Sequence, residues 1–324
     1  MTPPERLYRY RPLDGDIFAR ELGALKDGYL WSPHFADMND PMEAFYELGG
    51  ASDAVVDLML KPSGKSTADM YGMAKGIIDN FCLVSFSSSP ADLPLWAYYG
   101  SNFAGMCLEF ATDTLFVGDF QNERIVPVTY ATEPLPAIQL HELVTQEAIE
   151  NRLSRKRVEW KHEKEWRILT GAGGARHYLD DALLRIYLGP RVQDEHARHI
   201  CDLFKSRPTE ILRGRITGYS LSFETVKPAT PASNCERVGP GTLNLDDLLY
   251  SRDEIEAFLS VPIDRLIEEL QAIAARPNVD AVSGCDLSVN HKKEALYVWT
   301  EHRLRSDRVV WERRYYDRRL RRID

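Results

Sequence analysis

The chain of 324 residues lacks the features that mark membrane and secreted proteins. No apolar run approaches the roughly 18 residues that a membrane-spanning helix needs. The opening Met-Thr-Pro-Pro-Glu-Arg is followed by no apolar stretch, so we expect no secretory signal peptide. The five cysteines are odd in number, scattered and never spaced as C-x-x-C, which argues against a disulfide or zinc framework. These absences predict a cytoplasmic protein with reduced thiols.

Several familiar catalytic and nucleotide-binding motifs are absent as well. The sequence contains no G-x-x-x-x-G-K-[ST] loop, no G-x-G-x-x-G, no H-E-x-x-H and no G-x-S-x-G elbow. P-loop hydrolysis, a Rossmann dinucleotide site and zinc-protease chemistry are therefore not indicated. We predict no metal site.

Composition and charge indicate an ordinary globular protein with an unusual end. Hydrophobic residues make up 44% of the chain and charged residues 27%, and the length suggests about two domains. The net charge is −9, yet residues 301–324 hold nine arginines, no lysine and five acidic residues. We expect this end to dock on the acidic body of the protein or to contact a protein or nucleic acid.

The order of the elements predicts an α+β fold, with short mixed or antiparallel strands and flanking helices. A helix is expected near residues 15–26, where Gly28 ends it, and another near 140–157. An apolar strand is expected at 81–87. The domain boundaries follow from a segment rich in proline and glycine: an α+β domain at 1–225, a linker at 226–243 and a smaller, mainly helical segment at 244–324. Residues 294–316 fit either a charged hairpin or a helix.

Five short motifs resemble an uncharacterised bacterial domain family. Its pattern runs as Y-[KR]-Y, F-N-D-P-x-E, C-F-S, W-x-x-Y-[AG] and E-K-E-W-R. The matching residues are Tyr8-Arg9-Tyr10, Phe35 with Asn39-Asp40-Pro41 and Glu43, Ser85-Phe86-Ser87, Trp96 to Gly100, and Glu163 to Arg167. The resemblance covers roughly residues 6–225 and implies a domain boundary, since the family brings no known activity.

The order of these motifs also resembles the ADP-ribosyltransferase layout: an arginine on the first strand, an S-x-S strand and a late E-x-E strand. Arg9, Ser85-Phe86-Ser87 and Glu163-Lys164-Glu165 follow that order. The resemblance implies an enzyme that binds NAD and either transfers ADP-ribose or hydrolyses NAD, with an unknown acceptor. Breaking the nicotinamide–ribose bond builds positive charge on the ribose, which a fixed carboxylate stabilises.

The site residues are assigned on that basis. Glu165 is expected to be the main catalytic carboxylate and Glu163 the second, because on a strand both would point to one face. An arginine binds phosphate oxygens bidentately, and aromatic rings stack on the cationic nicotinamide. The residues expected to bind NAD are Tyr8, Arg9, Ser85, Ser87, Trp96, Tyr98 and Tyr99.

Two other classes of function stay open from the sequence. Glu159-Trp160-Lys161, with Asp113 or Asp119 upstream, has the skeleton of a metal-dependent nuclease. Alternatively, the protein is a non-enzymatic interaction module in which Trp96, Tyr98 and Tyr99 line a ligand groove. Each motif taken alone also fits a purely structural role.

Overall fold

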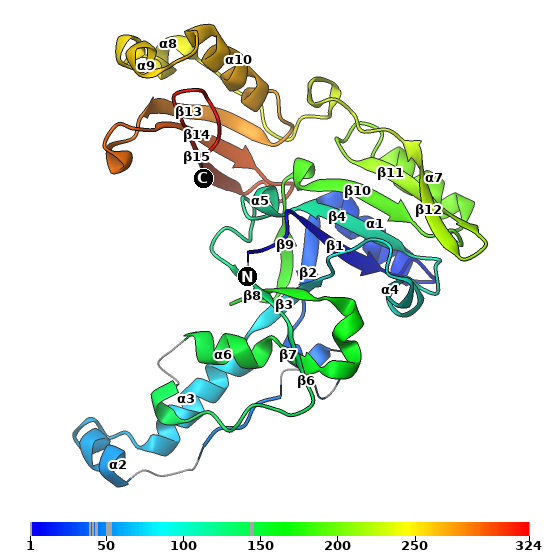
Figure 1. Cartoon of the computed structure of the whole chain (residues 1–324), viewed down its shortest axis with the longest axis vertical. Helices are drawn as coiled ribbons and strands as arrows, with labels where there is room; N and C mark the ends of the chain where they lie inside the picture. The colour runs from blue at the N-terminus through cyan, green and yellow to red at the C-terminus, as the bar shows by residue number, and fades with distance from the viewer. Residues whose placement is uncertain are drawn as a thin grey trace.

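The computed structural model describes residues 2–38, 40, 42, 45–49, 54–142 and 146–323. The fold is α+β, as predicted: small sheets are mixed with short helices. Figure 1 shows a central body, with helices α2 and α3 projecting at one end and residues 245–316 packed at the other. None of the described helices is long and apolar enough to cross a bilayer.

The central body is built on a sheet with the strand order β1-β4-β10-β11-β12. Strand β4 is buried along its whole length because it lies between β1 and β10, antiparallel to both. Strands β10 and β11 are parallel, and the chain between them crosses over through helix α7. The bounds are β1 (Arg6–Arg11), β4 (Met106–Ala111), β10 (Leu183–Leu188), α7 (Asp194–Leu203), β11 (Glu210–Thr217) and β12 (Ser220–Lys227).

Two glycines of the body stand where a side chain does not fit. Helix α1 (Ile17–Asp27) ends at Gly28, which has a φ of 65° in the left-handed region, so the predicted helix and its stop are confirmed. A Cβ on Gly105 would lie 2.4 Å from the carbonyl oxygen of Arg11, so only glycine allows β4 to start against β1.

A second sheet carries much of the candidate site. Its strand order is β3-β8-β5 and all its pairs are antiparallel. The apolar strand expected at 81–87 is β3. The bounds are β3 (Cys82–Phe86), β8 (Trp166–Thr170) and β5 (Arg124–Pro127), with the smaller pairs β2 (Tyr29–Ser32) with β9 (Gly174–His177) and β6 (Thr129–Ala131) with β7 (Arg155–Arg157). The helices around these strands are α2 (Ala54–Leu60), α3 (Thr67–Asp79), α4 (Leu93–Tyr98), α5 (Thr112–Leu115) and α6 (Gln146–Leu153).

The helix expected over residues 140–157 is shorter than predicted. Helix α6 ends at Leu153, and residues 155–157 form β7, parallel to β6. The run Arg155-Lys156-Arg157 fits a helix by propensity, but the middle residue is buried while its neighbours are not. Alternating burial of this kind is the pattern of a strand.

The C-terminal segment has its own apolar core between helices and a sheet in the order β13-β14-β15. The prediction that this segment is mainly helical was wrong, because its strands contain about as many residues as its helices. Of the two structures left open for residues 294–316, the hairpin is the one that forms, since β14 and β15 are antiparallel neighbours. The bounds are α8 (Leu245–Leu248), α9 (Arg252–Phe258), α10 (Ile263–Ala274), β13 (Val279–Leu287), β14 (Leu296–Arg303) and β15 (Val309–Tyr316).

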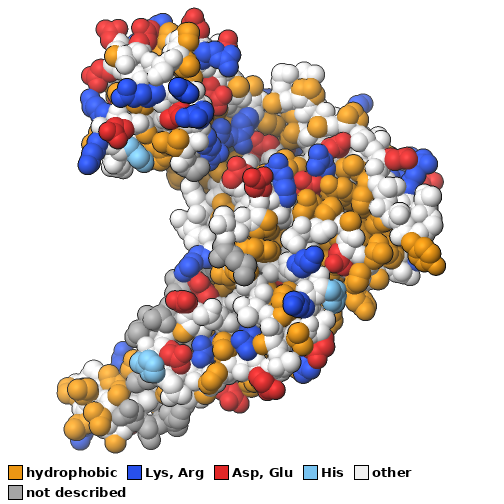
Figure 2. Space-filling model, viewed as in Figure 1, with side chains coloured by type: hydrophobic (Ala, Val, Ile, Leu, Met, Phe, Trp, Pro, Cys, Tyr) orange, Lys and Arg blue, Asp and Glu red, His pale blue; other side chains and the backbone are white. Residues whose placement is uncertain are grey.

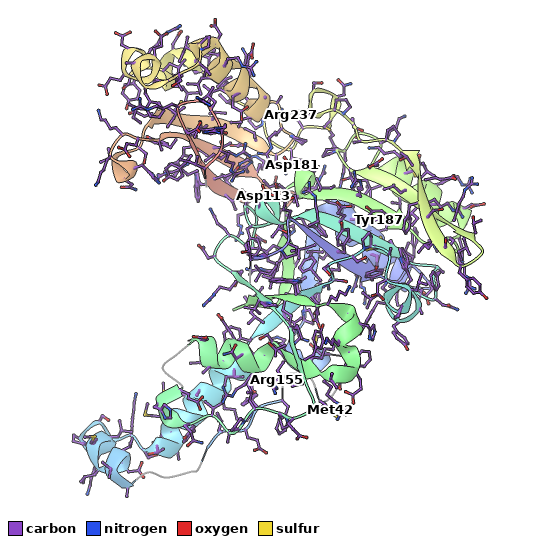
Figure 3. The ribbon with its side chains drawn as sticks, in the orientation of Figure 1. Met42, Asp113, Arg155, Asp181, Tyr187 and Arg237 are labelled. Carbon is purple, nitrogen blue, oxygen red and sulfur yellow. The ribbon has the colours of Figure 1, made fainter. Side chains whose placement is uncertain are left out.

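Ion pairs join this segment to the acidic body, as expected for the arginine-rich end. The guanidinium of Arg305 donates two hydrogen bonds to the buried carboxylate of Asp180, at 2.8 and 2.6 Å. Figure 3 marks Asp113 and Asp181, two further acidic residues at this junction. The other pairs across it are Arg308–Asp119, Arg276–Asp181 and Arg322–Asp113. The boundaries at residues 225 and 243 stay predictions.

We predict that Arg305→Ala strongly destabilises the protein. It leaves the Asp180 carboxylate, whose side chain is 2% exposed, without its bidentate partner. Removing one partner of a buried pair costs about 3–5 kcal/mol in the free energy of unfolding. Urea unfolding followed by tryptophan fluorescence measures the difference.

The matched control is Arg265→Ala, which removes an exposed pair with Glu268 on α10. Exposed pairs of this kind contribute at most about 1 kcal/mol. Equal unfolding midpoints for the two variants would contradict the docking role of Arg305.

Candidate functional site

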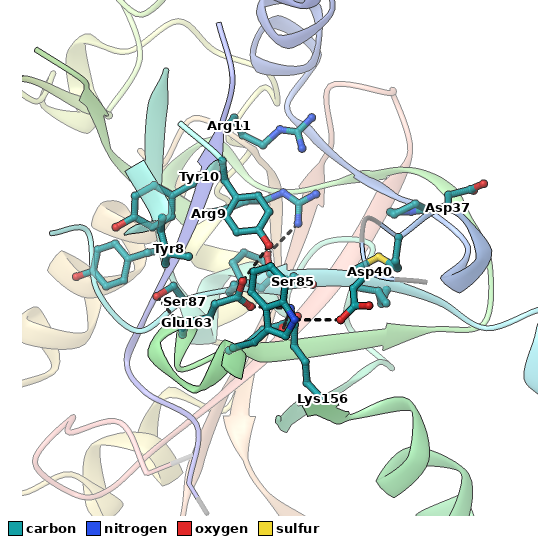
Figure 4. A pocket seen from close by; sticks show the side chains of 18 residues that line it. Tyr8, Arg9, Tyr10, Arg11, Asp37, Asp40, Ser85, Ser87, Lys156 and Glu163 are labelled. Carbon is teal, nitrogen blue, oxygen red and sulfur yellow. Dashed lines mark hydrogen bonds and ion pairs between the residues drawn. The ribbon is translucent and has the colours of Figure 1, made fainter. Parts of the chain in front are cut away.

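A cavity of about 300 Å³ lies where β1, β3 and the residues before β8 meet. Seven of the nine residues assigned to the site from the sequence line it: Tyr8, Arg9, Ser85, Ser87, Tyr99, Glu163 and Glu165. Figure 4 labels five of them around the cavity, although they come from segments far apart in the chain: Tyr8, Arg9, Ser85, Ser87 and Glu163. Trp96 and Tyr98 do not line the cavity.

Backbone pairing brings the three motifs together. The backbone of Tyr8 on β1 exchanges two hydrogen bonds with the backbone of Ser87, at 2.9 and 2.7 Å. The hydroxyl of Ser87 then donates to the carbonyl oxygen of Glu163, at 3.0 Å. These contacts fix the first strand, the S-x-S segment and the E-x-E segment to one another.

Arg9 supplies a positive charge that no carboxylate neutralises directly. Its guanidinium donates to the carbonyl oxygens of Ser85 at 2.9 Å and Trp31 at 3.5 Å. Within the described part of the chain it forms no ion pair. Burial lowers the pKa of Arg9, because desolvation disfavours the charged form, and the nearby Arg11 lowers it further. A partly buried cation without a carboxylate partner attracts an anion.

The other arginine of the first strand is already paired. Arg11 binds the carboxylate of Glu21 on α1 through both Nε and Nη2. Burial acts to raise the pKa of Glu21, but the hydrogen bonds and charge of Arg11 outweigh it, so the net shift is downward. Arg11 thus anchors α1 to β1 and is not available to a ligand in the same way as Arg9.

Another part of the cavity wall belongs to a chain of buried charges, which we call the ion chain: Glu163, Lys156, Glu165 and Arg167. The first three line the cavity, and Arg167 lies behind Glu165. Lys156 Nζ lies 2.6 Å from Glu163 and 3.1 Å from Glu165. Arg167, which is fully buried, donates to both oxygens of Glu165, at 2.8 and 3.1 Å. The chain alternates in sign and is neutral in sum.

The two carboxylates of the ion chain have different surroundings. Glu165 is bound by two cations, Lys156 and Arg167, whereas Glu163 is bound by Lys156 and by the hydroxyl of Tyr99, which donates at 2.9 Å. Burial raises the pKa of Glu165, while Lys156 and the hydroxyl of Ser85 oppose the rise. Burial acts to lower the pKa of Lys156, but the two carboxylates raise it on balance, so the lysine stays charged.

The local backbone around the E-x-E motif differs from the prediction. Glu163 ends a short 3-10 helix (Val158–Glu163), Lys164 has a φ of 46°, and β8 begins only at Trp166. The carboxylates of Glu163 and Glu165 therefore do not share the face of a strand. They converge because the left-handed turn at Lys164 reverses the chain between them and both reach Lys156.

The aromatic motif is a helix and divides its rings among three environments. Trp96 is 0% exposed, donates its indole N–H to the carbonyl of Pro90 and belongs to the apolar core. Tyr98 is 68% exposed. Tyr99 follows the helix and points its hydroxyl at Glu163. The three rings line no common groove, so the interaction-module hypothesis loses its binding site.

Several residues that line the cavity were not assigned to it from the sequence, among them Lys156, Trp160 and Asp40. The indole N–H of Trp160 donates to Asp40 at 3.0 Å, and Lys156 Nζ lies 5.2 Å from the centre of the Trp160 ring. The F-N-D-P-x-E resemblance did contain Asp40. Asn39, Pro41 and Glu43 of that motif lie outside the described residues.

The nuclease skeleton is not assembled among the described residues. Glu159 is exposed and pairs with Arg157, whereas Asp119 contacts His177 and Arg308 at the junction with the C-terminal segment. No group of three His, Cys, Asp or Glu side chains in this part of the chain is arranged to hold a metal ion.

Comparison with known proteins identifies one segment. Residues 95–168 match the model of a family described as a protein of unknown function, DUF2971. The predicted resemblance to an uncharacterised domain family is confirmed over these residues. The segment contains Tyr99 and the whole ion chain but neither Arg9 nor Ser85. No curated protein and no solved structure matches the chain, and nothing in these comparisons supports the ADP-ribosyltransferase resemblance.

We predict that Glu165→Gln lowers stability by about 2–4 kcal/mol, because it removes the buried negative charge that pairs with both Lys156 and Arg167. The unfolding midpoint in urea measures the loss. Glu159→Gln, which alters an exposed pair six residues earlier, should change the free energy of unfolding by less than about 1 kcal/mol. A Glu165→Gln variant as stable as this control would contradict a structural role for the ion chain.

Proposed function

We propose that the cavity binds NAD and cleaves its nicotinamide–ribose bond, releasing ADP-ribose to water or to another acceptor. The observation that supports this most is the convergence of Arg9, Ser85 and the Glu163/Glu165 pair on one cavity. An arginine with only carbonyl partners faces a wall of buried carboxylates. A ligand with phosphate at one end and a developing cation at the other suits that arrangement.

The size of the cavity limits how much of the dinucleotide it encloses. About 300 Å³ is the lower end of the range of roughly 300–1,000 Å³ for ligand pockets. The nicotinamide and its ribose are the part that the cavity encloses in this proposal, while the adenosine lies outside. The Arg9 guanidinium binds phosphate oxygens, which carry the negative charge that it lacks among its present partners.

Glu163 is the carboxylate that we assign to the reaction, in reversal of the ranking expected from the sequence. Glu165 is already bound by two cations, so its field at the ribose is largely cancelled. Glu163 has one cation, and Tyr99 orients its other oxygen. As the glycosidic bond breaks, nicotinamide leaves with the bonding electrons and the ribose becomes cationic. Glu163 stabilises that cation, water adds to it, and one proton is released.

We predict that Glu163→Gln lowers the rate of nicotinamide release from NAD by about 10²–10³-fold, as expected for loss of one preorganised group. Initial rates measured by chromatography on folded parent and variant proteins test this. Glu159→Gln is the control, because it removes an exposed carboxylate from the same 3-10 helix without touching the cavity.

Two tyrosines give a second matched pair for the same assay. Tyr99→Phe removes the hydroxyl that orients Glu163, whereas Tyr98→Phe removes a hydroxyl from an exposed side chain. The first should slow the reaction about tenfold or more and the second should not. A parent protein that neither binds nor cleaves NAD contradicts the proposal, as does parental activity in Glu163→Gln.

A further inference from the structure

The sheet of the C-terminal segment leaves one of its faces open. Side chains of β14 alternate: Leu296 and Val298 are fully buried against the helices, whereas Tyr297 and Trp299 are partly exposed. On β15, Trp311 is 49% exposed and Arg313 is exposed as well. The helices α8 to α10 lie on the opposite side of the sheet (Figure 1).

Cross-strand pairing collects aromatic rings on this open face. Tyr297 stands opposite Tyr315, Trp299 opposite Arg313, and Glu301 opposite Trp311. Directly paired residues of antiparallel strands share a face of the sheet. The ring of His291 extends the row, since its centre lies 4.5 Å from that of Tyr315.

The arginine in this row lies over two aromatic rings. The guanidinium carbon of Arg313 lies 4.3 Å from the centre of the Trp299 ring and 5.4 Å from that of Tyr297. No ion pair is formed by Arg313 with any described residue. By contrast, Arg303 on the same face pairs with Asp280. Figure 2 shows Lys and Arg side chains over this part of the molecule, interleaved with Asp and Glu side chains.

A glycine on the neighbouring strand keeps the central ring accessible. Gly284 of β13 stands opposite Trp299. A Cβ at Gly284 would come within 3.4 Å of Trp299 and 3.7 Å of the Tyr297 ring. Any larger side chain would cover these rings from the β13 side, and glycine leaves that space free.

We propose that this open face binds single-stranded nucleic acid. Every unpaired base offers a π face that stacks on Trp, Tyr or a planar guanidinium, and a backbone phosphate supplies the anion that Arg313 lacks. Arg305, Arg308 and Arg322 are used in ion pairs with the body, so Arg313 is the arginine that we assign to the phosphate. The proposal does not depend on the cavity or its activity.

Fluorescence anisotropy with labelled 12-nucleotide oligo(U) and oligo(dT), added to the full chain at low salt, tests the proposal. We expect the parent to bind with a Kd of about 10⁻⁶–10⁻⁴ M, weakening as salt is raised. Trp299→Ala and Arg313→Gln should each weaken binding at least about tenfold. Tyr219→Ala and Arg265→Gln are the controls, because both side chains are exposed and lie on other elements.

Several outcomes overturn the proposal. The proposal is wrong if the parent binds no oligonucleotide. It is also wrong if the parent binds a duplex of the same length with equal affinity, because stacking requires unpaired bases. Trp299→Phe is included because the alanine variant could misfold. It keeps an aromatic ring at the position and should retain most of the affinity. Thermal melting checks the fold of each variant. The parent could instead bind no oligonucleotide and self-associate in sedimentation. If Trp299→Ala abolishes that self-association, the face binds a second copy of the chain and the proposal is wrong.

Discussion

The ion chain of Glu163, Lys156, Glu165 and Arg167 is the constraint on which the candidate site depends. Each of these charges is almost completely removed from water. A buried charge without a partner costs several kcal/mol, so the four groups are tolerable only in a fixed mutual arrangement. That arrangement ties β7, the 3-10 helix and β8 together, because each contributes one member and Glu165 lies between the last two. The left-handed turn at Lys164 is a consequence, since it is the turn that brings both carboxylates to Lys156.

The cavity owes its chemical asymmetry to the contrast between this wall and the first strand. The ion chain is neutral in sum, whereas the partly buried Arg9 donates to carbonyl oxygens and forms no ion pair with a described residue. Arg11, two residues later on the same strand, is neutralised by Glu21. A ligand that enters the cavity therefore meets one positive site and one wall whose outermost carboxylate, Glu163, is the least neutralised. This division between binding and reacting groups is the basis of the proposed function.

The sequence predicts the strongly patterned parts of the fold and the grouping of the motifs, but not the local geometry of the site. Helix α1 with Gly28 and strand β3 have clear periodicity and clear stops, and both are found. Lys156 was missed because the basic run around it fits a helix, and only tertiary burial makes it a strand. The E-K-E motif predicted a shared strand face, whereas pairing to a lysine seven residues before Glu163 bends the backbone instead. Periodicity does not report such long-range charge pairing.

Hydrogen–deuterium exchange of the full chain with and without NAD tests most directly whether the three motifs form one NAD site. Because one ligand would contact all three motifs, we expect NAD to slow exchange at once in three separated segments: residues 6–11, 82–87 and 156–167. Exchange in residues 279–316, which form the C-terminal sheet, should not change. Unchanged exchange in the three segments at saturating NAD, or slowing confined to the C-terminal sheet, would contradict the claim that these motifs form one NAD site.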